Sequence, residues 1–407
     1  MAFDRASFTV CGFVLFNMAI TLFIWCYIYE MKCEYFDKPT LLDLNSTLTT
    51  GNALIDGILN GLFIATIIAL MGIILSQCIS HQLISYVILF VKSSFLMTAF
   101  IMPANIIYDF YLKFLGSNNS YIYLYTIITS LSFTLLIITA YFTNNFPSFL
   151  QQIFSVFNCS FISIYYLRFL PRHTIWFLMI AVIFWDLFAV NSSFGPLKVA
   201  ALNAQNFNEG ILRFMFFIAK NDKDEEECDN NNNNNKEDKV TFKNSENNST
   251  NDNNILNEEL NNSPSESLSF SDDDDCENLS IMEEINEERT AYDALNASGQ
   301  TIIGVGDFII YGLLVGKAAT DMNGWYNLPV LFTIIGILIG LFFTLYLSEK
   351  SDKNNDNDEN EEEKEDNLGY FPALPIPLAI GIFLYFLSSF IIKYNYWLLS
   401  KENKEEI

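Results

Sequence analysis

The most regular feature of this chain is a series of long apolar runs separated by polar segments. Nine runs reach about 20 residues, the length that a helix needs to cross roughly 30 Å of hydrocarbon. They cover approximately 8–29, 54–75, 83–108, 121–142, 150–168, 173–190, 301–319, 327–347 and 371–392. We expect the first run to stay as an anchor, because polar residues and no small-residue cleavage pattern follow it. The pattern predicts an all-α membrane protein with nine transmembrane helices.

The charge of the chain is concentrated in two polar segments. The 407 residues are 51% hydrophobic and yet carry a net charge of −25. Residues 221–290 account for −17 of this charge and residues 349–366 for another −7. Segment 221–290 is too polar to bury a core, so we expect a long, disordered, cytosolic loop between the sixth and seventh helices. It would divide the chain into an N-terminal membrane region, 1–220, and a C-terminal one, 291–407.

The numbers and positions of the cysteines and histidines limit which disulfides and metal sites the chain could form. The seven cysteines show no paired spacing, so we expect free thiols. The two histidines, His81 and His173, lie far apart in the sequence, which leaves little from which to build a zinc site. We therefore expect neither a metal ion nor another cofactor, and nothing in the acidic composition indicates a nucleic-acid partner.

Two aspartates lie inside apolar runs. An aspartate within a span costs several kcal/mol, so such residues usually face the bundle interior or a water-filled cavity. A hydrogen bond to a neighbouring helix would explain either aspartate alone. Asp186 lies four residues before the end of its run and Asp307 about six after the start of the next. In an antiparallel hairpin both would lie within roughly 10 Å of the same membrane face, and this matching depth predicts a pair.

A pair of carboxylates in a medium of low dielectric can perform acid–base chemistry. At hydrogen-bonding distance the two groups cannot both ionise, so their proton affinities split. One then acts as a base toward water while the other donates a proton to a scissile carbonyl. Asp186 and Asp307 are therefore the candidate catalytic residues for peptide hydrolysis without a metal ion.

Glycines and prolines interrupt the apolar runs near these aspartates. Gly304 and Gly306 precede Asp307, and each costs a helix roughly 1 kcal/mol relative to alanine. Close helix packing and the approach of a substrate backbone both explain them. Pro372, Pro375 and Pro377 open the ninth run. Three prolines predict an irregular start that lines a cavity, whereas a single proline in a first helical turn would be ordinary.

Other polar residues leave a second class of function open. Asp56, Lys92 and Asp109 lie in or near spans, as the lining of a cation path would. A solvated helix end or a helix–helix hydrogen bond explains each of them more simply. A non-proteolytic scaffold or cation leak channel therefore remains an alternative.

Taken together, these motifs resemble the signature of the presenilin family of intramembrane aspartyl proteases. The signature segments are Trp185-Asp186, Gly304-Val305-Gly306-Asp307 and Pro372-Ala373-Leu374. Segments 195–198, 308–311, 314–318 and 373–376 also look like presenilin segments in the same order. The resemblance extends over about 54–220 and 289–392.

The resemblance implies roles for individual residues. Asp186 and Asp307 would form the catalytic dyad, and Gly304, Val305 and Gly306 would complete the second motif. Residues flanking the dyad would shape the active site and pair with substrate: Trp185, Phe371, Pro372, Ala373 and Leu374. Where the family usually has Tyr, Leu and Leu, this chain has Trp185, Val305 and Phe371, which keep bulk and apolarity.

The resemblance also implies a cellular setting. It suggests a γ-secretase complex with nicastrin and two small polytopic subunits, acting in the lipid bilayer on single-pass transmembrane proteins. It further implies self-cleavage in the large loop, and residence in endoplasmic reticulum and Golgi membranes, or endosomal and plasma membranes. A related alternative is the signal peptide peptidase family, which has the opposite membrane orientation and typically Gln where this chain has Phe371.

Overall fold

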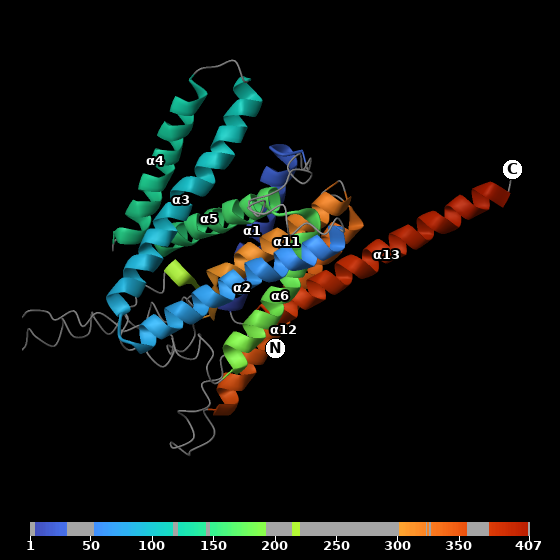
Figure 1. Cartoon of the computed structure of the whole chain (residues 1–407). Helices are drawn as coiled ribbons and strands as arrows, with labels where there is room; N and C mark the ends of the chain where they lie inside the picture. Colours follow the sequence, from blue (N-terminus) through green and yellow to red (C-terminus); the bar gives the residue numbers. More distant parts are fainter. Residues whose placement is uncertain are drawn as a thin grey trace, which may run out of the picture. The chain divides into compact units, whose positions relative to one another are not determined.

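Nine helices and two short strands make up the described part of the chain (Figure 1). The computed structural model describes residues 5–30, 53–116, 121–143, 147–192, 214–219, 301–322, 324, 327–355 and 374–405. The helices are α1 (Arg5–Tyr27), α2 (Ala53–Ser80), α3 (Ile84–Leu115), α4 (Ile122–Phe142), α5 (Ser148–Phe169), α6 (Arg172–Asn191), α11 (Val305–Met322), α12 (Leu328–Asn355) and α13 (Pro375–Glu405). The strands are β1 (Phe216–Ala219) and β2 (Thr301–Gly304). All of these elements belong to one compact unit, formed by Met1–Asn221 and Arg289–Ile407.

Several sequence predictions concern residues outside the described ranges. They include the disorder of loop 221–290, the acidic segment after residue 355, and the segment 195–198. Phe371, Pro372 and Ala373 also lie outside the described residues. These predictions, and the division into regions 1–220 and 291–407, stay predictions.

The apolar runs form helices, as the all-α prediction requires. A backbone in hydrocarbon must satisfy its own hydrogen bonds, and a helix does so within one segment. Among the described residues, seven helices are long and apolar enough to cross a membrane, namely α1, α2, α3, α4, α6, α12 and α13. Polar side chains such as Ser160 in α5 and Lys317 in α11 lower the apolarity of the other two helices, and these side chains are buried. The all-α membrane architecture is confirmed, and the crossing of the membrane by α5 and α11 remains a prediction.

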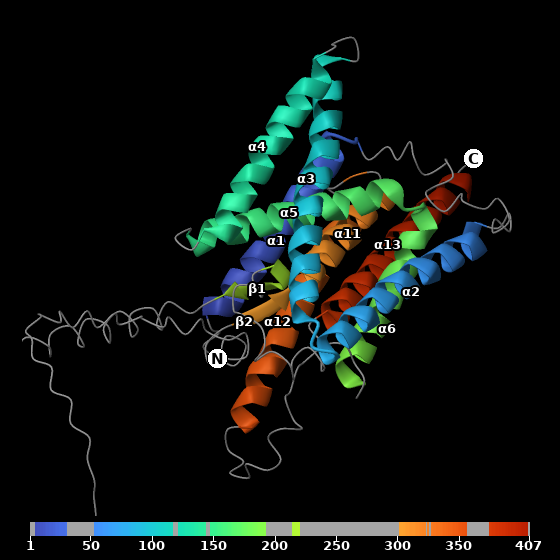
Figure 2. The same cartoon turned by 60° about the vertical axis from the view of Figure 1, so that its left-hand side comes forward.

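Helix α11 lies at the centre of the packed helices (Figure 2). Every residue from Tyr311 to Thr320 is buried, and α11 contacts α1, α5, α6, α12 and α13. Glycines allow α5 to approach closely. A Cβ atom on Gly316 would lie only 2.2 Å from Cδ1 of Leu167. A helix buried on all sides can carry polar groups at its ends without exposing them to lipid.

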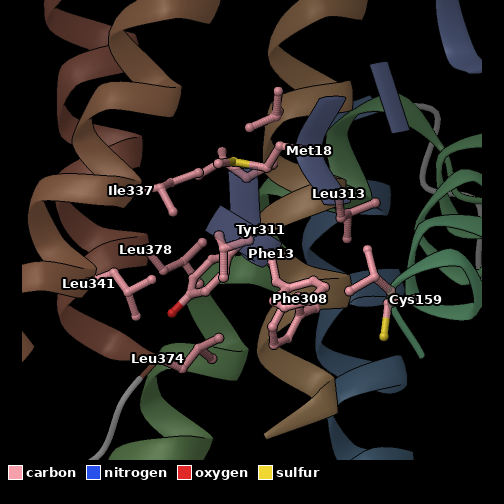
Figure 3. Packing of buried hydrophobic residues seen from close by; sticks show 14 of the residues in the cluster. Phe13, Met18, Cys159, Phe308, Tyr311, Leu313, Ile337, Leu341, Leu374 and Leu378 are labelled. Atoms are coloured by element: carbon pink, nitrogen blue, oxygen red, sulfur yellow. The ribbon is translucent and has the colours of Figure 1, made fainter. Parts of the chain in front are cut away.

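The hydrophobic core joins α11 to its neighbours (Figure 3). Phe308 and Tyr311 of α11 pack in one cluster with Met18 of α1 and Leu341 of α12. The outer helices are different, because 6% of the span of α2 is buried inside the protein, against 56% of the span of α1. We infer that the exposed apolar side chains of α2, α3 and α4 face lipid.

The polar residues that suggested a cation path have local explanations. Asp109 accepts a hydrogen bond from the hydroxyl of Tyr29 at 2.8 Å and forms an ion pair with Arg168. Lys92 Nζ lies 5.9 Å from the centre of an aromatic ring of α4. Asp56 lies in the first turn of α2, where the helix dipole stabilises an acidic side chain. The helix–helix bond and the helix end therefore describe these residues better than a common path does.

Candidate active site

Asp186 and Asp307 come together from two helices. Asp186 lies near the C-terminal end of α6, and Asp307 lies in the first turn of α11. Helices α6 and α11 are in contact, and the two carboxyl groups lie close enough for their charges to interact. The structure thus brings together the two candidate catalytic residues that the sequence places more than a hundred positions apart.

The start of α11 holds the carboxylate of Asp307. The helix begins at Val305, so Asp307 is its third residue. The backbone N–H of Gly304 interacts with this carboxylate, as a third-residue acid does when it reaches back to the residue that caps a helix. A Cβ atom on Gly304 would lie 3.5 Å from Oδ1 of Asp307. The side chain is therefore folded back against the backbone that precedes the helix.

Asp186 meets the start of α13. The backbone N–H of Leu374 interacts with its carboxylate, and the Leu374 side chain is 4% exposed. The second carboxylate oxygen of Asp186, Oδ2, is buried and has no hydrogen-bond partner among the described residues. A buried polar atom without a partner is costly and calls for an explanation. An oxygen that exchanges a proton during a reaction is one.

A two-stranded sheet precedes Asp307. Strands β1 and β2 pair antiparallel, with Phe216 opposite Gly304 and Ala219 opposite Thr301. The prediction that the seventh apolar run is helical throughout is therefore wrong for residues 301–304. Their backbone forms sheet hydrogen bonds with a segment that lies far away in the sequence. This pairing uses part of the backbone that directly precedes Asp307.

Side chains from three elements hold β1 in place. Gln152 Nε2 of α5 donates a hydrogen bond of 2.8 Å to the carbonyl oxygen of Ile218. The ring of Phe217 lies 5.0 Å from that of Phe13 and 5.1 Å from that of Phe308. The sequence analysis did not identify β1. Its signal was a short apolar run of aromatic and β-branched residues, too short to be a span.

The residues beside the two aspartates differ in their surroundings. Gly306 is exposed, and a Cβ atom added there would meet nothing within 4 Å. Close packing between described residues therefore does not explain this glycine, and the approach of a substrate backbone stays a prediction. Val305 is half-buried, and its carbonyl oxygen lies 3.7 Å from the thiol of Cys159. Trp185 is half-buried, with its ring 5.6 Å from that of Phe188.

The start of the ninth run is more regular than predicted. Helix α13 begins at Pro375, and the carbonyl oxygen of Leu374 accepts a hydrogen bond from the N–H of Leu378 at 3.2 Å. Pro375 and Pro377 fall in the first turn, where backbone N–H groups have no partner within the helix. The expected irregular start is therefore wrong for these two prolines. Pro372 and Ala373 lie outside the described residues.

Tyr311 is a member of the site that the sequence analysis missed. It follows Asp307 by one helical turn, is fully buried, and lies close enough to interact with the charges of Asp307 and Asp186. Figure 3 shows its hydroxyl oxygen on the side of Leu374 and Leu341. The spacing of four residues from Asp307 was the available signal, because such residues share one face of a helix.

Several known proteins are similar in sequence to this chain. A family model described as Presenilin matches residues 8–354. Presenilin spe-4 of Caenorhabditis elegans is 27% identical, over 93% of this chain and 94% of that protein. Two other proteins of that organism are similar over about half of their length. Presenilin hop-1 is 26% identical over 59% of this chain and 54% of that protein, and Presenilin sel-12 is 23% identical over 60% and 55%.

Proposed function

Since the chain belongs to the presenilin family and is an integral multi-pass membrane protein, we propose that it is an aspartyl endopeptidase that cleaves transmembrane helices. The observation that carries this proposal is the pairing of Asp186 and Asp307 in one site. Each carboxylate also meets the backbone N–H of a neighbouring segment. An acid pair enclosed by apolar helices, beside backbone able to bind an extended peptide, supports hydrolysis of a peptide bond.

The proposed reaction needs only a water molecule and the two carboxyl groups. The ionised member of the pair takes a proton from water, and the resulting hydroxide oxygen bonds to the scissile carbonyl carbon. The protonated member gives its proton to the carbonyl oxygen, which yields a neutral diol. When the C–N bond breaks, the amine nitrogen receives a proton and one diol hydroxyl loses one. The pair is thereby returned to its starting charge.

The substrate must first lose its helical structure. A transmembrane helix satisfies all of its own amides, so its peptide bonds are not accessible until it becomes extended. Among the described residues the sheet has two strands, which leaves one edge of β2 available to a third strand. We expect the extended substrate to bind at this edge or along the segment 372–374. Gly306 and Leu374 would then lie beside the substrate.

The wider assignment rests on family membership. We include in the proposal a γ-secretase-like complex with nicastrin and two small polytopic subunits. Its substrates would be single-pass transmembrane proteins in membranes of the endoplasmic reticulum, the Golgi or compartments beyond. Self-cleavage within 221–290 belongs to the same proposal. A presenilin-like membrane orientation is also proposed, in place of the inverted orientation of signal peptide peptidases.

Replacing either aspartate tests the proposed function. In membranes that contain the assembled complex and a single-pass substrate, Asp186→Ala or Asp307→Ala should lower product formation at least about 100-fold, because each removes one acid–base partner. Asp56→Asn, which changes an acid in the first turn of α2, is the matched control and should cleave normally. Equal cleavage by all variants would overturn the proposal.

The same variants separate proteolysis from a scaffold or channel role. They are introduced into cells that lack the protein, and rescue of the resulting defect is scored beside product release. A proteolytic role predicts that rescue is lost together with cleavage. Full rescue by a variant that does not cleave would assign the biological role to the non-proteolytic alternative.

A further inference from the structure

A buried side-chain amide forms a hydrogen bond to the backbone directly after Asp307. Asn17 of α1 is fully buried, and its Nδ2 donates a hydrogen bond of 2.7 Å to the carbonyl oxygen of Phe308. The residue that carries this carbonyl is the neighbour of Asp307 along α11. An interior asparagine is costly unless both ends of its amide have partners, so the other end is informative.

Ser160 of α5 satisfies the other end of the amide. Its hydroxyl lies 2.7 Å from Oδ1 of Asn17 and donates to it, and Ser160 is also fully buried. A hydroxyl donor at Oδ1 leaves Nδ2 as the end that faces Phe308. The orientation of the Asn17 amide is therefore set by a residue from a third helix.

A second side chain forms a hydrogen bond to the next carbonyl of the same turn. The hydroxyl of Ser163 donates a hydrogen bond of 2.8 Å to the carbonyl oxygen of Ile309. It can approach because Gly312 has no side chain there. A Cβ atom on Gly312 would lie 2.7 Å from the Ser163 oxygen. Two successive carbonyls after Asp307 are thus held from α1 and from α5.

These bonds are not needed to form the helix. A carbonyl within α11 can already accept the N–H four residues later, so the side-chain bonds are additional. Bonds of this kind between membrane helices contribute only about 1 kcal/mol each. Their geometric effect is larger than their energetic one, because they fix the rotation and height of the turn that carries Asp307. Both bonds go to α11, which carries Asp307, and not to α6, which carries Asp186.

We infer that Asn17, oriented by Ser160 and assisted by Ser163, is a positioning residue that sets the place of Asp307 relative to Asp186. This inference rests on the proposed function of the two aspartates. Asn17 does not contact the reacting atoms and acts through the backbone of Phe308. Its loss should change the rate of the chemical step more than it changes substrate binding.

The first test replaces the amide by an apolar side chain of similar size. In the assembled complex, Asn17→Leu should lower kcat about 10-fold or more, since small displacements of a catalytic group are costly, while KM changes less than twofold. Ser130→Ala is the matched control. Ser130 of α4 is also fully buried and donates a hydrogen bond of 3.2 Å to the carbonyl oxygen of Phe100 of α3, and its loss should leave kcat unchanged.

A second variant distinguishes positioning from general destabilisation. Asn17→Asp keeps the shape of the side chain but replaces the N–H donor by a carboxyl group. When protonated, that group can donate to the carbonyl oxygen of Phe308, and when ionised it repels that oxygen. Because burial favours the protonated form, the kcat of Asn17→Asp should lie closer to that of the parent protein than the kcat of Asn17→Leu does, and it should fall at the pH at which the group ionises. A kcat for Asn17→Asp that is as low as that of Asn17→Leu at every pH would overturn the inference.

Hydrogen exchange gives a readout that does not depend on proteolysis. In Asn17→Leu, amide exchange should become faster in a peptide covering 305–313 and stay unchanged in one covering 328–345. If the parent protein cleaves and exchange rises while kcat does not change, the positioning role is wrong although the proposed function stands. If the parent protein does not cleave, the proposed function fails. If exchange in 305–313 is unchanged in Asn17→Leu, the hydrogen bond from Asn17 does not stabilise the start of α11, and the positioning role is wrong.

Discussion

At the scale of single residues, two glycines of one motif have different surroundings. Gly304 lies against the carboxylate of Asp307, and a Cβ atom there would be 3.5 Å from its Oδ1. Gly306 is exposed and faces open space. Gly304 thus contacts the acid directly, whereas Gly306 has open space beside it.

Gly306→Ala should separate folding from cleavage. No atom lies within 4 Å of the added methyl group, and alanine favours a helix over glycine by about 1 kcal/mol. The melting temperature should therefore be unchanged or slightly higher. Cleavage of a transmembrane substrate should fall about 10-fold, because the methyl group would displace the substrate backbone beside Asp307.

A glycine elsewhere provides the control for this prediction. Gly12 of α1 also has no atom within 4 Å of an added Cβ, so Gly12→Ala should leave cleavage unchanged and the melting temperature unchanged or slightly higher. If Gly306→Ala cleaves like the parent protein, the substrate does not approach at this position.

At the scale of elements, α11 packs closely against α5 because glycines of α11 face side chains of α5. Gly316 faces Leu167 of α5, whose side chain is fully buried. Gly312 faces Ser163 one turn earlier in α11. Close approach of this kind brings the hydroxyl of Ser163 within reach of the α11 backbone. The same interface between α5 and α11 therefore provides both the close packing and the hydrogen bond to the backbone after Asp307.

Gly316→Ala should destabilise this interface. The new Cβ would lie 2.2 Å from Cδ1 of Leu167, and overpacking of a core typically costs about 1–3 kcal/mol. The melting temperature of the protein in nanodiscs should fall. The double variant Gly316→Ala/Leu167→Ala should lose less stability than the sum of the two single variants, because the second change removes the clash. Strict additivity would contradict the close contact.

At the scale of the whole molecule, one largely buried acid, Asp321, links α6, α11 and α13. Asp321 of α11 forms an ion pair with Lys317 at 2.6 Å. It also accepts hydrogen bonds from Trp176 of α6 at 3.2 Å and from Tyr385 of α13 at 3.4 Å. Helices α6 and α11 also bear Asp186 and Asp307, and Leu374 directly precedes α13. The ends of α6 and α11 remote from the dyad are therefore linked to each other and to the N-terminal half of α13 by hydrogen bonds to Asp321.

Asp321→Ala should be among the most destabilising single changes in the chain. Lys317 is 0% exposed, and removing the partner of a buried charge typically costs about 3–5 kcal/mol. Replacing both residues, as Lys317→Met/Asp321→Ala, should cost less than Asp321→Ala alone, because no charge is left buried. Thermal unfolding of the purified protein measures both effects.

An exposed ion pair is the control for this prediction. The side chains of Lys113 and Glu30, 2.8 Å apart, are 34% and 54% exposed. Exposed pairs contribute about 0–1 kcal/mol, so Glu30→Gln should change the melting temperature little. A loss as large as that of Asp321→Ala would mean that burial does not account for the difference.

The sequence by itself determined the helices and the candidate acids. Hydrocarbon imposes both the length and the apolarity of a span, and these are local properties that can be read along the chain. An aspartate within such a run is conspicuous for the same reason. The nine helical segments and the positions of Asp186 and Asp307 therefore needed no knowledge of their neighbours.

Only the tertiary structure decided what lies beside these acids. The strand at 301–304 exists because residues 216–219 pair with it, and apolar residues suit a buried helix as well as a strand. Three other features likewise depend on partners far apart in the sequence. They are the regular start of α13, the position of Tyr311 near both aspartates, and the hydrogen bond from Asn17 to Phe308. Hydrophobic patterning records which residues avoid water, and it does not record which buried groups meet.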